Sequence, residues 1–156
     1  MSLPEIGALW IGPRLSILEQ LCLKSFADMG HPLTLYTYGE LENPPEFAEI
    51  RDAREVWDDD VVIVHEGRGS PAVHSDIFRV KMIAATGKIW VDADAYCLKP
   101  FETKDGYLVG LQKPGQANNG VLALPPDSPT LRDFGAFLAT RGDYPPWWED
   151  GERAAC

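Results

Sequence analysis

Apolar residues along the chain form short runs that alternate with longer segments of helical periodicity. The short runs are rich in β-branched, aromatic or leucine residues, and most of them end at a glycine, a proline or a polar turn. Both features are typical of buried strands. These runs predict strands at residues 8–11, 33–38, 61–64, 89–91, 107–111 and 121–124.

Apolar residues at helical spacing predict helices between and after these strands. The first helix is expected to begin at Ser16, because Ser16 and Glu19 have the S-x-x-E spacing of a capping box. The last helix has Asp127 or Ser128 as its N-cap. The helices are expected within residues 16–30, 75–87 and 125–140.

Strands that alternate with helices favour an α/β fold, with a sheet that is largely parallel at its start and has helices on both faces. The chain has 156 residues and shows no internal repeat or low-complexity segment, so we expect one domain over residues 1–156. In open sheets of this kind, ligands bind beyond the carboxyl ends of the strands. Polar residues at those ends are therefore the first candidates for a site.

Composition narrows the function classes. A hydrophobic content of 45% and a charged content of 24%, without a run of about 18 apolar residues, predict a soluble, cytoplasmic protein. The formal net charge of -10 disfavours nucleic-acid partners, and a phosphate-bearing ligand would need a cation or a helix N-terminus to offset repulsion. The three cysteines have no CxxC pair, which argues against a disulfide framework or a zinc site.

Two carboxylates, Asp92 and Asp94, come directly after the predicted strand at residues 89–91. In an extended segment, residues two apart point to the same side, so a turn after Asp92 lets their oxygens converge. Converging carboxylates suit Mg²⁺ or Mn²⁺, which commonly take further ligands from substrate phosphates and water. A D-x-D tripeptide is short and common, however, and by itself it can simply be a polar turn.

Asp76 and Arg79 precede this strand on the predicted helix over residues 75–87. Their spacing places them on one face of that helix as an i,i+3 pair. The pair is either an ordinary surface ion pair or an acceptor and a cationic donor that bind sugar hydroxyls or phosphate.

The segment HSDIFRVKMIAATGKIWVDADAYCLKPF, residues 74–101, resembles the SD-x-x-R … D-x-D signature of a glycosyltransferase family, the sugar-binding region containing DXD motif. Two outlying segments agree with it: ALWIG at residues 8–12 and QANNGVLALPPDSP at residues 116–129. The resemblance implies a GT-A fold of Rossmann-like type. It also implies a nucleotide-sugar donor, most often a UDP-sugar, a divalent metal on the diphosphate, and transfer that retains the anomeric configuration.

The resemblance also implies roles for residues around the nucleotide and the metal. Trp10 would stack on the uracil, a type of contact that contributes about 1–3 kcal/mol per base in nucleic-acid complexes. Asp92 would lie near the ribose and the metal, and Asp94 would ligate the metal directly. These two carboxylates are the candidate catalytic and metal-binding residues, with Mn²⁺ or Mg²⁺ as the cofactor.

On the sugar side, the resemblance implies that Asp76 and Arg79 hold hydroxyls of the donor sugar. Asn119, together with Asn118, would line the sugar pocket. Trp90 matches a family aromatic residue beside the donor, although packing in the core explains a tryptophan in a central strand equally well.

The chain departs from the family after residue 129. The family's domain generally continues into a region that binds the acceptor, whereas this sequence ends with DYPPWWEDGERAAC. We therefore expect a short version of the fold with an abbreviated acceptor part, or a truncated nucleotide-sugar binding module without catalysis. Trp147 and Trp148 would pack, associate with another copy in a homo-oligomer, or stack on a sugar. An aspartyl phosphatase fits less well, because its D-x-D lies on the first strand.

Overall fold

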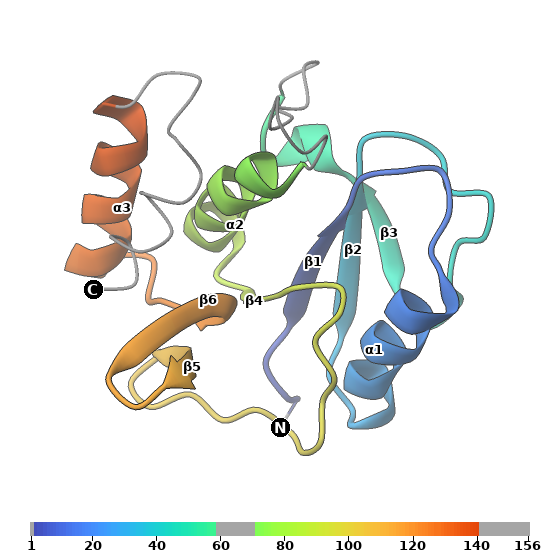
Figure 1. Cartoon of the computed structure of the whole chain (residues 1–156), viewed down its shortest axis with the longest axis horizontal. Coiled ribbons are helices and arrows are strands. Elements are labelled where there is room, and N and C mark those ends of the chain that lie inside the picture. The colour runs from blue at the N-terminus through green and yellow to red at the C-terminus, as the bar shows by residue number, and fades with distance from the viewer. Residues whose placement is uncertain (1, 59–70, 141–156) are drawn as a thin grey trace.

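The computed structural model describes residues 2–58 and 71–140 (Figure 1). The described chain combines a six-stranded sheet with three α-helices and one 3₁₀ turn. In chain order the elements are β1 (Ile6–Trp10), α1 (Ile17–Asp28), β2 (Leu33–Thr37), β3 (Glu49–Asp52), the 3₁₀ turn η1 (Ala53–Glu55), α2 (Ala72–Thr86), β4 (Ile89–Val91), β5 (Leu108–Lys113), β6 (Gln116–Ala123) and α3 (Pro129–Thr140).

The strand order in the sheet is β3-β2-β1-β4-β6-β5. The first four strands of this order are parallel, while β6 runs antiparallel to both β4 and β5. The chain moves outward from β1 to β3 and then returns through α2 to place β4 on the other side of β1. This reversal makes the carboxyl ends of β1 and β4 the switch point of the sheet, where ligands bind in open α/β folds.

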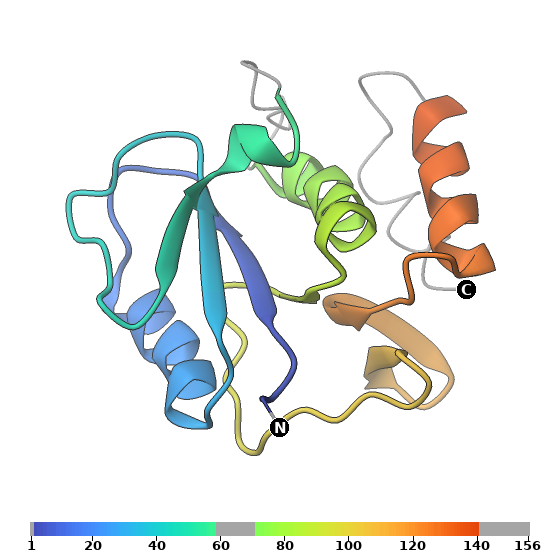
Figure 2. The same ribbon diagram turned by 180° about the vertical axis from the view of Figure 1, so that it is seen from behind.

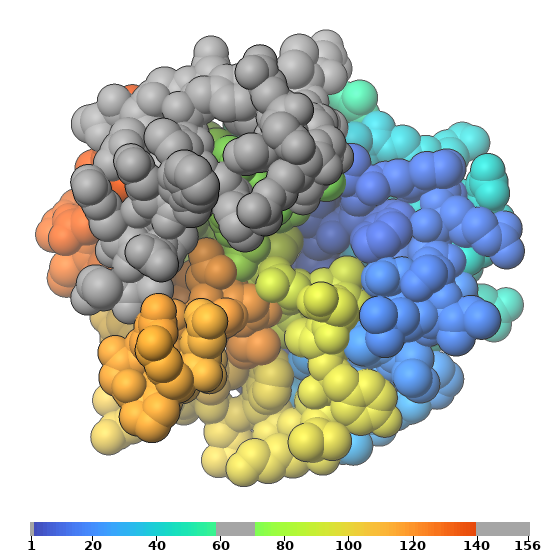
Figure 3. Space-filling model, viewed as in Figure 1, coloured from blue at the N-terminus to red at the C-terminus, as the bar shows by residue number. Residues whose placement is uncertain are grey.

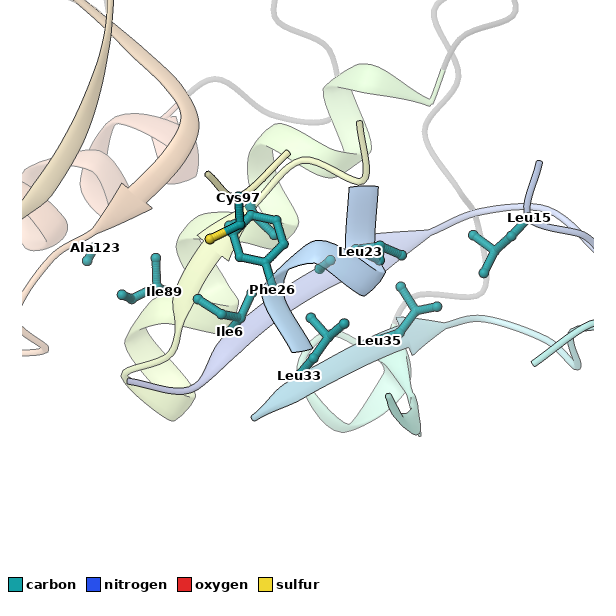
Figure 4. Packing of buried hydrophobic residues seen from close by; sticks show 11 residues of the cluster. Ile6, Leu15, Leu23, Phe26, Leu33, Leu35, Ile89, Cys97 and Ala123 are labelled. Carbon is teal, nitrogen blue, oxygen red and sulfur yellow. The ribbon is translucent and has the colours of Figure 1, made fainter. Parts of the chain in front are cut away.

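One face of the sheet packs against α1. Leu23 and Phe26 of this helix lie in one buried cluster with Ile6 and Ala8 of β1 and with residues of β2 and β4 (Figure 4). The helix begins where the sequence predicts, because the Ser16 hydroxyl accepts from the backbone N–H of Leu18 and the backbone N–H of Ser16 donates to Glu19 Oε2, at 3.2 and 2.9 Å. The predicted capping box is confirmed.

The opposite face packs against α2, and the two views of the ribbon show the helices on either side of the sheet (Figures 1 and 2). Phe78, Met82 and Ile83 of α2 form a second buried cluster with Leu9 and with residues of β2, β4 and β6. Helix α3 also contributes to this cluster, through the buried Leu131 and the partly buried Phe134 and Leu138. The Ser128 hydroxyl accepts from the backbone N–H of Leu131 at 3.1 Å. Of the two N-cap candidates, Asp127 and Ser128, it is therefore Ser128 that caps α3.

Several predicted element boundaries are wrong. Residues 49–52 form β3, for which the sequence predicted no strand, because β3 is an exposed edge strand of sequence EIRD without an apolar pattern. The strands expected at residues 107–111 and 121–124 are longer and meet in a hairpin, which places Asn118 and Asn119 within β6. Helix α2 begins at Ala72 rather than at residue 75.

Some predictions are not tested by the described residues. The strand expected at residues 61–64 lies outside them, as do Trp147 and Trp148. The domain boundaries of residues 1–156 stay a prediction. Among the helices of the described ranges, none is both long enough and apolar enough to cross a membrane.

Candidate functional site

The candidate site forms where β4 ends at the carboxyl edge of the sheet. The backbone N–H of Asp92 donates to the Gly120 carbonyl of β6 at 2.8 Å, and the Asp92 carbonyl accepts from the Ala95 N–H at 2.9 Å. These two hydrogen bonds tie Asp92 to the neighbouring strand and turn the chain directly after it. Ala93 and Ala95 pack against the core on the α1 side, while Asp94 is exposed.

Arg79 connects the polar groups of the site. Its side chain is 6% exposed, and its Nη2 lies 2.9 Å from Asp76 Oδ1 and 3.5 Å from Asp92 Oδ1. Its Nη1 donates to the Asn119 carbonyl at 2.7 Å, and its Nε donates to the Ser75 carbonyl at 3.3 Å. One guanidinium thus joins α2, β6 and the residue after β4, and the predicted i,i+3 pair is more than a surface ion pair.

The two carboxyls that contact Arg79 have raised pKa values. Burial is the largest cause for both Asp76 and Asp92, because it penalises the charged form, and the guanidinium of Arg79 opposes this effect. Asp94 adds a smaller repulsive contribution that also raises the pKa of Asp92. With all groups ionised, three carboxylates and one guanidinium leave a formal charge of -2 from Asp76, Asp92, Asp94 and Arg79. A divalent cation would neutralise this charge.

The amide residues of β6 complete the polar group. Asn119 Nδ2 lies 3.5 Å from Asp76 Oδ1, and Asn118 Oδ1 accepts from the backbone N–H of Gly120 at 2.7 Å. A Cβ added at Gly120 would lie 2.8 Å from Asn118 Oδ1 and 2.9 Å from Asp92 Oδ2. Any larger residue at position 120 would therefore push these oxygens apart.

Trp90 lies beneath the site rather than on its surface. It is 2% exposed, and its ring packs 6.2 Å from that of Phe78, with the Arg79 guanidinium 5.0 Å from its centroid. Its indole N–H donates to Asp92 Oδ1 at 2.9 Å. In this structure Trp90 presents almost no surface to a ligand and contacts the site through Asp92.

The structure brings six of the eight predicted site residues into one network: Asp76, Arg79, Trp90, Asp92, Asn118 and Asn119. Trp10 stands apart from it, because its ring packs against the cluster on the α1 face and its Nε1 donates to the Arg14 carbonyl at 3.1 Å. Asp94 acts on the network through its charge, which raises the pKa of Asp92, while its backbone carbonyl accepts from the Cys22 thiol of α1 at 3.4 Å. In the space-filling view, the segment after β4 reaches the surface between α1 and the β5–β6 hairpin (Figure 3).

The residues present fit a divalent cation in part. Carboxylate and amide oxygens are the ligands that Mg²⁺ and Mn²⁺ take, and Asp92 Oδ2 and Asn118 Oδ1 both face Gly120. Within the part of the chain that is described, no three His, Cys, Asp or Glu side chains are grouped so as to hold a metal by themselves. A metal here would take its remaining ligands from water and from the phosphates of a ligand.

Sequence reasoning missed two residues of this region. Gly120 leaves space that the oxygens of Asp92 and Asn118 border, and the only signal for it was its place after the two asparagines. Cys22 hydrogen-bonds the Asp94 carbonyl from across the α1 interface, and burial raises the pKa of its thiol. No local pattern indicates that contact, since 72 residues separate the two partners.

Comparison with known proteins supports the fold. No family model matches the sequence, and no curated protein matches it. Among solved structures, the chain is similar to one titled PaToxG Glycosyltransferase, with a TM-score of 0.67 and 16% sequence identity over 97% of this chain and 67% of that chain. The chain therefore has the fold of a glycosyltransferase, while the D-x-D family and the GT-A type remain predictions.

Proposed function

We propose that this chain binds a nucleotide-sugar donor, with UDP-sugars as the first candidates, and transfers the sugar to a saccharide or another hydroxyl-bearing acceptor. The observation that carries the proposal is the network around Arg79. It gathers Asp76, Asp92 and Asn119 from three elements at the switch point of a sheet that is similar to a glycosyltransferase. Hydrogen-bond acceptors and donors that cluster at such an edge suit the hydroxyls and the diphosphate of a sugar nucleotide.

In this proposal, Asp92 and Asp94 hold Mn²⁺ or Mg²⁺ at the diphosphate. When bound, such a metal stabilises the negative charge of a diphosphate leaving group as a Lewis acid. The Asp76 carboxylate accepts hydrogen bonds from hydroxyls of the sugar, and the Asn119 amide donates to the sugar. Arg79 holds both residues in place. Correct orientation of the reacting groups can by itself lower the barrier by several kcal/mol. Retention of the anomeric configuration and stacking of Trp10 on the base belong to the same proposal.

Binding without transfer is the second candidate function. It is favoured by the fact that the residues gathered in the network all belong to the donor side of the proposed reaction. The chain spans 67% of the length of the glycosyltransferase structure to which it is similar. Hydrolysis of the donor distinguishes the two functions, because a transferase without acceptor leaks sugar to water and a binding module does not.

Calorimetry tests the proposal directly. We expect UDP-glucose, UDP-galactose or UDP-GlcNAc to bind in the presence of Mn²⁺ and to bind more weakly without it. Asp94→Asn should weaken metal-dependent binding about 10-fold or more, since it removes a charged ligand. Asp133→Asn is the matched control, because Asp133 is an exposed aspartate on α3 whose side chain is 77% accessible. Binding that does not depend on Mn²⁺, or that Asp94→Asn leaves unchanged, would contradict the metal assignment.

A further inference from the structure

The hydrogen bond between Trp90 and Asp92 joins the hydrophobic core to the candidate site. Trp90 is 2% exposed and packs within the cluster on the α2 face, yet its indole N–H donates to Asp92 Oδ1 at 2.9 Å. A buried indole N–H usually finds an acceptor, and most side-chain hydrogen bonds go to the backbone or to water rather than to another side chain. Here the acceptor is the first carboxylate of the D-x-D, so packing of the core also fixes a group of the site.

The two oxygens of Asp92 have different surroundings. Oδ1 accepts from the Trp90 indole and lies 3.5 Å from Arg79 Nη2. Oδ2 faces Gly120, where an added Cβ would lie 2.9 Å from it. Of the contacts among the described residues, both side-chain partners of Asp92 engage Oδ1. The Asp92 carboxylate is therefore held through Oδ1, and its Oδ2 faces the space beside Gly120.

Gly120 makes room on the side that Oδ2 faces. A Cβ at this position would also lie 2.8 Å from Asn118 Oδ1, so both oxygens border the space that the absent side chain leaves. The backbone itself does not demand glycine at position 120, since its φ lies outside the positive range. Space for the oxygens is the reason for glycine that the contacts supply.

We propose that Trp90 is a positioning residue: with Arg79 it holds Oδ1 of Asp92, so that Oδ2, beside Gly120, is the oxygen that faces the metal or the donor. This inference rests on the proposed function and gives Trp90 a different role from contact with the donor. Partners that orient the ligands of a metal typically change metal affinity by 10- to 100-fold when they are removed.

Trp90→Phe removes the N–H and keeps an aromatic ring in the core. We expect it to weaken the affinity for Mn²⁺, measured by calorimetry in the presence of UDP, by about 10- to 100-fold. Phe78→Leu is the control for lost packing, because Phe78 contacts the Trp90 ring and makes no contact with Asp92 that the structure records. It should lower the unfolding temperature and leave the affinity for Mn²⁺ nearly unchanged.

Gly120→Ala tests the same idea from another strand. Its methyl group would crowd Asp92 Oδ2, so the affinity for Mn²⁺ in the presence of UDP should fall about 10-fold or more. Gly135→Ala on α3 is the matched control, since an added Cβ there meets nothing within 4 Å. Equal effects of the two glycine substitutions on metal affinity would overturn the role given to Gly120.

A nuclear magnetic resonance measurement tests the hydrogen bond without any ligand. The indole N–H signal of Trp90, assigned by its loss in Trp90→Phe, should shift in Asp92→Asn and stay in place in Asp94→Asn. A Trp90 indole signal whose position does not change in Asp92→Asn overturns the inference. So does a wild-type protein that binds Mn²⁺ and UDP no better than Trp90→Phe does. If the wild-type protein binds neither, the proposed function fails, and the positioning role fails with it.

Discussion

Arg79 is the residue on which the network of the site depends most. Its buried guanidinium neutralises part of the charge of Asp76 and Asp92 and bonds the Asn119 carbonyl. Arg79→Met would leave two half-buried carboxylates without a cation. Breaking a buried pair costs about 3–5 kcal/mol, and partial exposure of the aspartates lowers our expectation to about 2–3 kcal/mol. Urea denaturation measures this loss, and Arg132→Met, whose side chain is 74% exposed, is the control.

The same substitution should change how stability depends on pH. Burial raises the folded-state pKa of Asp76 and Asp92 above the ordinary value, so their stabilising contribution is full below the ordinary pKa and is lost as the pH rises through the folded one. Removal of Arg79 raises both pKa values further. The stability deficit of Arg79→Met should thus be largest near about pH 7 and shrink toward about pH 4. A deficit that grows on acidification would contradict this electrostatic account.

Single residues differ in how well the sequence predicts their part in the site. The spacing of Asp76 and Arg79 and the place of Asp92 after a strand are local features, so these residues could be found from the sequence. The role of Trp90 could not, because no local pattern shows which way a buried indole turns or that its N–H donates to Asp92 Oδ1. Gly120 depends likewise on two oxygens from different elements.

Among the elements, α2 lies close enough to β1 for the buried Met82 side chain to occupy the space beside Gly7. A Cβ at Gly7 would overlap Met82 Sδ. Gly7→Ala should therefore lower the free energy of unfolding by about 1–3 kcal/mol, the usual cost of overpacking a core. Met82→Val removes the atoms that clash, so the double variant should be less destabilised than the sum of the single variants.

Chemical denaturation of the four proteins of this cycle measures the coupling. Gly39→Ala is the control, because an added Cβ there meets nothing within 4 Å, and we expect a change within about 0.5 kcal/mol. Strict additivity of Gly7→Ala and Met82→Val would show that the two positions do not clash, and it would contradict the close approach of α2 to β1.

The elements that the sequence predicted well are those whose own pattern determines them. The apolar runs of β1, β2 and β4 and the capping box of α1 are such patterns. In contrast, β3 is polar and exposed and exists through its pairing with β2. The β5–β6 hairpin contains asparagines and glycines that disfavour strands, and its register shifts between Val109 and Gly110. Pairing with a neighbour overrides local propensity in both cases.

At the scale of the whole molecule, charge and topology act together. A chain with a formal net charge of -10 repels a diphosphate over most of its surface. The strand order, however, places the end of β4 between β1 and β6, where Arg79 and a divalent cation could offset that repulsion locally. Donor binding should therefore depend strongly on the cation and should be confined to this edge of the sheet.

Hydrogen exchange can test that confinement. We expect a UDP-sugar with Mn²⁺ to slow amide exchange around β4, β6 and the Asp76–Arg79 turn of α2, because the Asp92 N–H and the Arg79 guanidinium already join these segments. Ligand at 100 times its dissociation constant adds about 2.7 kcal/mol to the stability of the bound state. The edge strand β3 lies two strands beyond β1 and should show little local protection. UDP-sugar without Mn²⁺ is the control, and protection concentrated at β3 would place the donor elsewhere on the fold.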